Sequence, residues 1–232
     1  MNTPLPQKHQ LIIIDGWNAY YNDTQSLDFL IKCDWDLMAK HPSWKKWLAD
    51  GLSQDFQVIR PDMPNTMNAK YSEWKIWFEK YFRYIADVPR GDESTLDRVE
   101  QKNSHTKSKI ILVWHSLGTA FLVKYLSENP FPRHIDALHL VSPVFDDVGL
   151  AWETLGTFRF APQALAHFHK QVGHIHIWSS TDDDIVPYDH SVRYHVNLIG
   201  SVLHTFHDRG HFVWQAHFVE LFQELLKEIH TK

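Results

Sequence analysis

The chain has 232 residues, of which 44% are hydrophobic and 22% are charged, a composition typical of folded globular proteins. Its formal net charge of −5 lacks the basic excess of a nucleic-acid-binding protein, so we expect no nucleic-acid partner. A single cysteine, Cys33, excludes an intrachain disulfide. The apolar run 11–14 is too short for a signal peptide or a membrane span, and we therefore expect a cytoplasmic protein without a membrane span.

Strand and helix patterns alternate along the chain. Short apolar runs, many of them β-branched, predict strands near residues 10–14, 56–60, 110–114, 135–141, 174–179 and 202–206. Amphipathic spacing predicts helices near residues 44–52, 71–86, 117–128, 188–198 and 214–230. This alternation is typical of an α/β fold with a doubly wound, mainly parallel, six-stranded sheet flanked by helices. We expect residues 1–232 to form one such domain.

Two stretches are too long to be simple strand–helix connections, residues 17–43 and residues 143–172. Each begins at the C-terminal end of a predicted strand, and both are rich in aromatic residues. Long loops at this edge of a sheet commonly act as lids or pocket walls, so we expect both to overhang a site. The alternative is that the aromatic side chains pack as a secondary core, which we favour for most of them.

The sequence Trp-His-Ser-Leu-Gly, residues 114–118, joins the third predicted strand to a helix. A sharp strand-to-helix turn with Ser116 at its apex is the architecture of a nucleophile elbow, which exposes the serine hydroxyl to a base. The same turn brings the next backbone N–H close to the oxygen of an attacked carbonyl. A serine before a helix also commonly serves only as a cap, so the motif alone leaves both interpretations open.

Two later segments favour the catalytic interpretation. Three consecutive aspartates, residues 182–184, follow the predicted strand 174–179, and His211 follows the predicted strand 202–206. Serine, acid and histidine therefore occur in the chain order of hydrolases with a nucleophile elbow. Each also falls just beyond the C-terminal end of a predicted parallel strand, where open α/β sheets build their sites.

On these residues the chain resembles the α/β-hydrolases. The resemblance is closest to the small serine hydrolases typified by retinoblastoma-binding protein 9 and to related bacterial esterases. The stretches that carry it are residues 15–18, 44–48, 58–64, 115–118, 180–187 and 210–212. The resemblance implies a compact sheet in the strand order 2-1-3-4-5-6, without the first two strands of larger relatives. It also implies a Ser–Asp–His triad and an esterase-like activity.

The resemblance further implies the role of each site residue. Ser116 is expected to be the nucleophile and His211 the general base and later the general acid. Asp183, four residues before a proline, is expected to orient His211. The oxyanion-hole donors are expected to be the backbone N–H groups of Trp17 and Leu117.

The sequence departs from the family pattern at four positions. Asp15 stands where a histidine is usual, Ala19 where a second glycine is frequent, and Asp184 where a proline is frequent. Trp114 replaces the first small residue of the elbow. We expect its ring to lie beneath the turn and to crowd the next helix. The alternative is that small neighbours accept the ring and leave the turn undistorted. The backbone angles of Ser116 distinguish a formed elbow from a relaxed turn.

The 17 histidines raise the question of a metal. His174 and His176 alternate onto one face of a predicted strand, while His204 and His207 precede His211. Zinc sites usually need three ligands, and the chain has no H-E-x-x-H motif and no cysteine pair. We therefore expect packed or surface histidines and no metal. Gly16 has no companion glycines that would form a phosphate cradle, so we expect no cofactor.

Together these features predict a serine hydrolase that cleaves small carboxylic esters, and less readily amides, through an acyl-enzyme. The alternative is a non-catalytic protein with the hydrolase fold that binds a ligand or partner through its aromatic loops. The complete set of serine, acid and histidine favours catalysis, whereas Trp114 favours the alternative.

Overall fold

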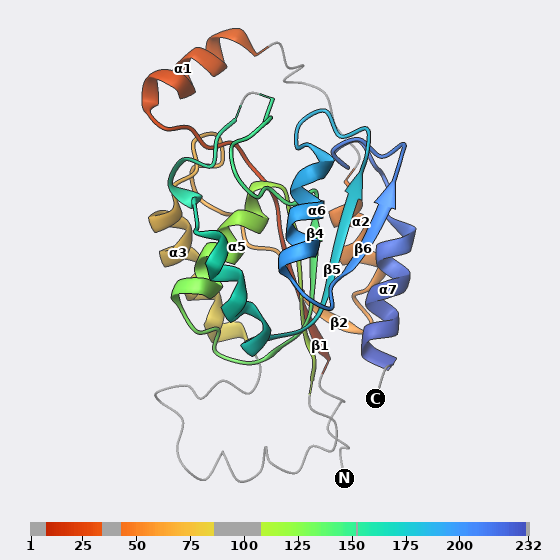
Figure 1. The fold of residues 1–232 in the computed structure, drawn as a ribbon. Coiled ribbons are helices and arrows are strands. Elements are labelled where there is room, and N and C mark those ends of the chain that lie inside the picture. The colour runs from red at the N-terminus through yellow and green to blue at the C-terminus, as the bar shows by residue number, and fades with distance from the viewer. Residues whose placement is uncertain (1–7, 34–42, 86–107, 152, 231–232) are drawn as a thin grey trace, which may run out of the picture.

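The computed structural model describes residues 8–33, 43–85, 108–151 and 153–230, and a six-stranded parallel sheet lies at its centre (Figure 1). The spatial order is β2-β1-β3-β4-β5-β6. Both the predicted fold class and the strand order are confirmed, and each predicted strand lies within two residues of its observed ends. The strands are β1 (His9–Ile14), β2 (Phe56–Ile59), β3 (Ile110–His115), β4 (Ile135–Val141), β5 (Val172–Ser180) and β6 (Val202–Phe206).

Helices cover both faces of the sheet (Figure 1). One face packs against α2 (Trp44–Gly51) and α7 (Val219–His230). The other packs against α3 (Tyr71–Lys80), α5 (Leu117–Glu128) and α6 (Tyr188–Asn197). Among the described residues, no helix combines the length and the apolar character needed to cross a membrane.

Strand β3 shows why a continuous apolar run forms the central strand of such a sheet. Its side chains alternate, so Leu112 and Trp114 pack on the α3/α5/α6 side. Ile111 and Val113 pack on the α2/α7 side. All six residues of the strand are buried, because both faces of the sheet are covered.

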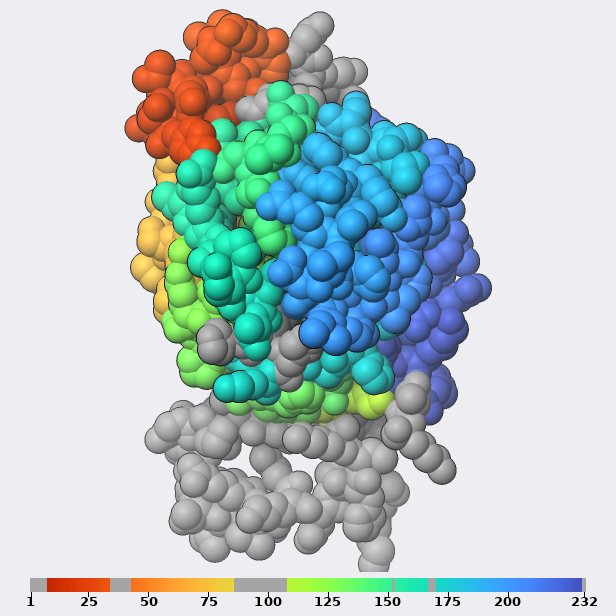
Figure 2. Space-filling view, viewed as in Figure 1, coloured from red at the N-terminus to blue at the C-terminus, as the bar shows by residue number. Residues whose placement is uncertain are grey.

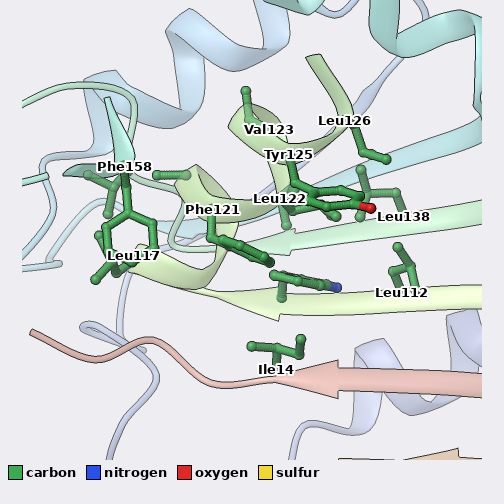
Figure 3. Packing of buried hydrophobic residues seen from close by; sticks show 14 of the residues in the cluster. Ile14, Leu112, Leu117, Phe121, Leu122, Val123, Tyr125, Leu126, Leu138 and Phe158 are labelled. Carbon is green, nitrogen blue, oxygen red and sulfur yellow. The ribbon is translucent and has the colours of Figure 1, made fainter. Parts of the chain in front are cut away.

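Trp114 lies within a large aromatic cluster between β3 and the helices. Its ring stacks on Phe121 at 5.3 Å and meets Phe78 edge-on at 5.3 Å. Figure 3 shows Phe121 and Tyr125 of α5 pointing toward the strands. The ring is therefore accepted by large aromatic neighbours, not by small ones. Ser116 nevertheless has φ +52° and ψ −129°, so the turn has not relaxed into helix or strand.

Two predicted helices have different bounds in the structure. The last one begins at Val219 instead of residue 214, because the segment before it is held by α2. The backbone N–H of Trp44 donates to the Gln215 carbonyl at 3.0 Å, and its indole N–H donates to the Phe212 carbonyl at 2.9 Å. Helix α3 ends at Lys80 and continues as a 3-10 turn, Tyr81–Tyr84. Residue 86, the predicted end, lies outside the described residues.

The stretch 17–43 contains a helix that the sequence pattern did not predict. Helix α1 (Asp23–Lys32) begins after Asn22, whose side chain accepts the N–H of Gln25 at 3.0 Å. It projects from the end of the molecule at which the strands end (Figures 1 and 2). Three of its apolar side chains are exposed: Leu27, Leu30 and Ile31. Residues 34–42 of this stretch lie outside the described residues.

The stretch 143–172 forms two 3-10 helices, Gly156–Phe158 and Pro162–Lys170. Phe158 is buried against Trp74 and Phe121, as expected for a secondary core. The N–H of Thr154 donates to the Ala19 carbonyl at 3.0 Å, so this stretch contacts the stretch that follows β1. Residue 152 lies outside the described residues.

Candidate active site

Ser116 occupies the single residue between β3 and α5. Its positive φ is rare for a residue with a side chain and stores backbone strain. Three hydrogen bonds stabilise the turn. The N–H of Ser116 donates to the Val141 carbonyl at 2.9 Å, and the Ser116 carbonyl accepts the N–H and the hydroxyl of Thr119 at 2.9 and 2.6 Å. These bonds hold the serine in a conformation that it would not adopt alone.

Two glycines allow the loop after β1 to pack tightly against this turn. A Cβ at Gly16 would lie 2.3 Å from the Cβ of Ser116 and 3.0 Å from the Leu117 nitrogen. A Cβ at Gly118 would lie 3.0 Å from the Asp15 carbonyl oxygen. Both approaches require the absence of a side chain. The backbone of residues 15–17 therefore runs directly beside the start of α5.

His211 lies on the connection between β6 and α7, between two residues with positive φ, Gly210 at +51° and Phe212 at +59°. Its Nε2 lies 2.9 Å from the Ser116 hydroxyl oxygen, and its Nδ1 lies 2.9 Å from Asp183 Oδ2. Ser116 and His211 are each at most 5% exposed. The three residues that the sequence singled out thus meet at the carboxyl edge of the sheet.

The environment of Asp183 favours its ionised form. Its side chain is fully buried, and Oδ1 accepts the N–H groups of Ile185 and Val186 at 3.0 and 2.9 Å. Burial alone would raise the pKa of Asp183, but the hydrogen bonds from His211 and the two backbone N–H groups hold that pKa below its ordinary value. An ionised Asp183 assigns the proton to His211 Nδ1, which leaves Nε2 as an acceptor toward Ser116.

The neighbouring aspartates have other contacts. Asp182 accepts the backbone N–H of Gly210 at 3.0 Å and also bonds to the Ser180 hydroxyl. Asp184 is exposed. Of the three aspartates, Asp183 is therefore the one in contact with His211, at the position that the family resemblance indicates.

Of the two expected oxyanion-hole donors, Leu117 directly follows Ser116, and Trp17 directly follows Gly16, which packs against Ser116. Within the described part of the chain, neither the N–H of Trp17 nor that of Leu117 donates to a protein acceptor. Leu117 is the first residue of α5, and the first N–H groups of a helix have no partner inside the helix. Both donors are therefore available to a bound group.

Behind the histidine lies a buried polar network that the sequence analysis missed. Lys45 forms an ion pair with Asp15, and its Nζ lies 3.2 Å from His115 Nδ1. His115 Nε2 lies 2.8 Å from the carbonyl oxygen of His211. Burial, with added repulsion from Lys45 and His211, holds the pKa of His115 well below its ordinary value. His115 is therefore neutral, accepts from Lys45 and donates to the His211 backbone.

One residue in the sequence could have indicated this network. Asp15 departs from the family's usual histidine, and it is the partner of Lys45. Lys45 itself reads as an ordinary surface residue of a short amphipathic helix, so its burial could be found only from the tertiary structure.

A buried carboxyl group, Glu153, also lies near Asp183. Its Oε1 has no hydrogen-bond partner among the described residues. Burial and then the nearby charge of Asp183 raise the pKa of Glu153 to about 8. Glu153 is therefore mostly protonated at neutral pH.

Several solved structures share this fold. The ydeN gene product from B. subtilis superimposes with a TM-score of 0.67 at 20% sequence identity, over 97% of this chain and 100% of that chain. Est1E from Butyrivibrio proteoclasticus gives 0.55 at 17% identity, over 97% and 90%. A meta-cleavage product hydrolase, CumD, from Pseudomonas fluorescens IP01 gives 0.61 at 11% identity, over 97% and 92%. At these identities the likeness establishes the fold alone.

No curated protein sequence matches the chain. The model of one protein family, described as serine hydrolase, matches residues 88–227, which is more than half of the chain. The matched region includes Ser116, Asp183 and His211. The chain therefore belongs to the serine hydrolase family and is a hydrolase with the α/β-hydrolase fold.

Proposed function

We propose that this hydrolase cleaves small carboxylic esters with Ser116 as nucleophile, His211 as general base and acid, and Asp183 as the residue that orients His211. The observation that carries the proposal is the position of the imidazole. Its two nitrogens lie 2.9 Å from the Ser116 hydroxyl and 2.9 Å from the Asp183 carboxylate.

In the first half-reaction, Ser116 Oγ attacks the ester carbonyl carbon while its proton passes to His211 Nε2. The buried carboxylate of Asp183 stabilises the imidazolium that forms. The tetrahedral intermediate collapses, the bond to the alcohol oxygen breaks, and His211 gives its proton to the leaving alcohol. An acyl group then remains on Ser116.

In the second half-reaction, water attacks the acyl carbon and gives a proton to His211 Nε2. Collapse of the second intermediate returns that proton to Ser116 Oγ and releases the carboxylic acid. In both intermediates the negative oxygen would accept hydrogen bonds from the N–H groups of Trp17 and Leu117. Their unused hydrogen-bonding capacity and the close approach at Gly16 support this role.

The substrate class rests on the chemistry of the site and on the fold. Est1E and a putative carboxylesterase from Lactobacillus plantarum share the α/β-hydrolase fold, the latter with a TM-score of 0.58 at 13% identity. Helix α1 and the stretch 143–172 would form walls of the substrate site. The exposed apolar side chains of α1, at the end where the strands terminate, suit an apolar acyl or alcohol group. The whole chain would act as one domain on a small-molecule ester.

Labelling with a fluorophosphonate probe tests the proposal. The wild-type protein should react covalently, and Ser116→Ala should lose both labelling and ester turnover, the latter by several orders of magnitude. Thermal melting of both proteins controls for folding, since the substitution removes one hydroxyl. If the folded wild-type protein neither labels nor hydrolyses p-nitrophenyl esters of short acids, the alternative of a non-catalytic binding protein is favoured. Full labelling of the alanine variant would exclude Ser116 as the nucleophile.

A further inference from the structure

A second group of imidazoles and carboxylates lies on the α2/α7 side of the sheet, apart from the hydrolase site. Strand β5 contributes His174 and His176, which share a face because they are two residues apart. Helix α7 contributes Glu224 and Glu228, which share a face because they are four residues apart. Strand β6 adds His204 beside them.

Three of these side chains bring potential ligand atoms close together. One ligand atom each of His176, Glu224 and Glu228 lies within 4.8 Å of the other two. The distance between His176 Nε2 and Glu228 Oε1 is 3.2 Å. In a tetrahedral zinc site with bonds of about 2.0–2.2 Å, neighbouring ligand atoms lie roughly 3.3–3.6 Å apart. Small side-chain rotations would therefore bring the three groups to bonding distance of one ion.

The residues around the three ligands orient them as in known metal sites. His204 Nε2 lies 3.0 Å from His176 Nδ1 and can accept its hydrogen, which leaves His176 Nε2 with a free lone pair. His174 Nδ1 lies 2.9 Å from the second oxygen of Glu228. His139 stacks on the His176 ring with 4.8 Å between centroids. His176 and Glu228 are thus held by hydrogen bonds and stacking before any ion arrives.

Glu224, one of the three ligands, borders a neighbouring cavity. This cavity of about 310 Å³ lies over β5, β6 and α7 and is lined in part by His204 and Glu224. Lys227 lines it too and pairs with Glu224 at 2.7 Å, and its side chain is 68% exposed. An incoming cation would replace its charge beside Glu224.

We propose that His176, Glu224 and Glu228 form a binding site for one divalent transition-metal ion, with Zn²⁺ as the reference ion. One imidazole nitrogen and two carboxylate oxygens suit Zn²⁺ and its neighbours in the first transition row better than Mg²⁺ or Ca²⁺, which prefer oxygen ligands alone. The sequence analysis expected no metal because it searched for local histidine motifs. The two carboxylates come from a helix far along the chain from β5.

The proposed ion would join α7 to β5. The connection between β6 and α7 carries His211, so occupancy would also restrain the segment that holds the hydrolase histidine. Bound metal stabilises the folded chain by mass action, and the melting temperature should rise with Zn²⁺ concentration. This effect does not depend on the proposed ester hydrolysis.

The test uses the full chain, stripped with EDTA and then titrated with ZnCl₂ by isothermal calorimetry. We expect one ion per chain and, because Glu224→Gln removes a ligand, an affinity lower by at least about 100-fold, the upper end of what the loss of an outer-shell partner costs. Glu224 is suited to the test because its side chain is partly exposed and its loss should leave the fold intact. The matched control is Glu220→Gln, one turn earlier on α7, which lines the same cavity and pairs with Arg209. It should bind Zn²⁺ like the wild-type protein.

Two further measurements separate this site from the other histidines of the chain. Co²⁺ should give a visible absorption band in the wild-type protein that Glu224→Gln loses, and MgCl₂ at the same concentration should not compete with it. Melting curves recorded without metal show whether each variant is folded. Absence of Zn²⁺ binding by the wild-type protein would overturn the proposal and identify the group as an ion-pair network. Equal binding by wild type and Glu224→Gln would also overturn it, because the ion would then sit elsewhere.

Discussion

The two faces of the sheet differ in what they bury. The face covered by α3, α5 and α6 is filled mainly by aromatic and aliphatic side chains, among them Trp74, Phe78, Trp114 and Phe121, with His190 and Glu153 as buried ionisable exceptions. The face covered by α2 and α7 also has an apolar core, but it buries ionisable groups beside that core: Lys45, His115, His139, His176 and Glu228. The first face thus contributes mainly hydrophobic stability, while the second holds chemically active groups in fixed positions.

Most buried polar groups on the second face have partners. Lys45 pairs with Asp15 and His115, and Glu228 pairs with His174 and His176. Such groups cost free energy unless each donor and acceptor is matched, so their pairing requires side chains from several elements at once. The proposed triad lies at the carboxyl edge of the sheet, next to this network. The comparison therefore predicts two kinds of effect. Substitutions on the face covered by α3, α5 and α6, the aromatic face, should mainly lower stability. Substitutions on the face covered by α2 and α7, the polar face, or at the adjacent triad should mainly lower catalytic activity.

The largest expected effect is on turnover. Asp183→Asn should lower kcat by about 10⁴, because the amide no longer holds the His211 tautomer that accepts the serine proton. Steady-state hydrolysis of a p-nitrophenyl ester measures it. Asp184→Asn, at an exposed neighbouring position, is the control and should retain nearly full activity. If Asp184→Asn were the crippling change, the acid would be assigned to the wrong residue.

A change on the aromatic face should affect stability instead. Trp114→Ala removes a fully buried ring that contacts Phe78 and Phe121, and it should cost about 3–5 kcal/mol in the free energy of unfolding. Urea denaturation followed by circular dichroism measures this cost. Under conditions where the variant is folded, probe labelling of Ser116 should persist, since hydrogen bonds to Val141 and Thr119 hold the turn. Loss of labelling in a folded variant would show that Trp114 also shapes the turn.

The same contrast explains what could be predicted from the sequence. Apolar runs such as residues 110–114 specify a buried strand locally, so the six strands and their approximate ends followed from the pattern. Ser116, Asp183 and His211 were singled out because each follows a strand and the family order constrains them, and the structure brings the three side chains together. Helix α1 was missed, since its apolar side chains are largely exposed and show no core-facing stripe. The networks of Lys45 and Glu228 join residues distant in the chain, and no local pattern reports such contacts.

Glu153 is an exception on the aromatic side, where its neighbour Leu155 belongs to the core. Its pKa of about 8, against an ordinary 4.5, means that the folded chain keeps a proton that the unfolded chain loses. The contribution of Glu153 to stability should therefore fall as pH rises from 4.5 to 8, by up to about 1.4 kcal/mol per pH unit. Glu153→Gln cannot ionise, so it should match the wild type near pH 4 and be more stable at pH 8.

Urea titrations of both proteins at several pH values measure this difference. The unfolding free energies of wild type and Glu153→Gln should diverge steadily through the window and stay apart by a constant amount above pH 8. A difference that does not change with pH would mean that the carboxyl group is ionised in the folded chain throughout this range.

The smallest expected effect tests whether the polar face positions the chemistry. Lys45→Met keeps the approximate length of the side chain but removes the donor to His115. Without that donor, the His115 tautomer that donates to the His211 carbonyl is no longer fixed. A small displacement of His211 should lower kcat about tenfold, equivalent to about 1.4 kcal/mol, with KM little changed because Lys45 is buried. The adjacent Lys46→Met is the matched control, since Lys46 is exposed and pairs with Asp50 on the surface. Full kcat in Lys45→Met would mean that the bonds from Trp44 to this segment suffice to hold the histidine, and that the network contributes to folding alone.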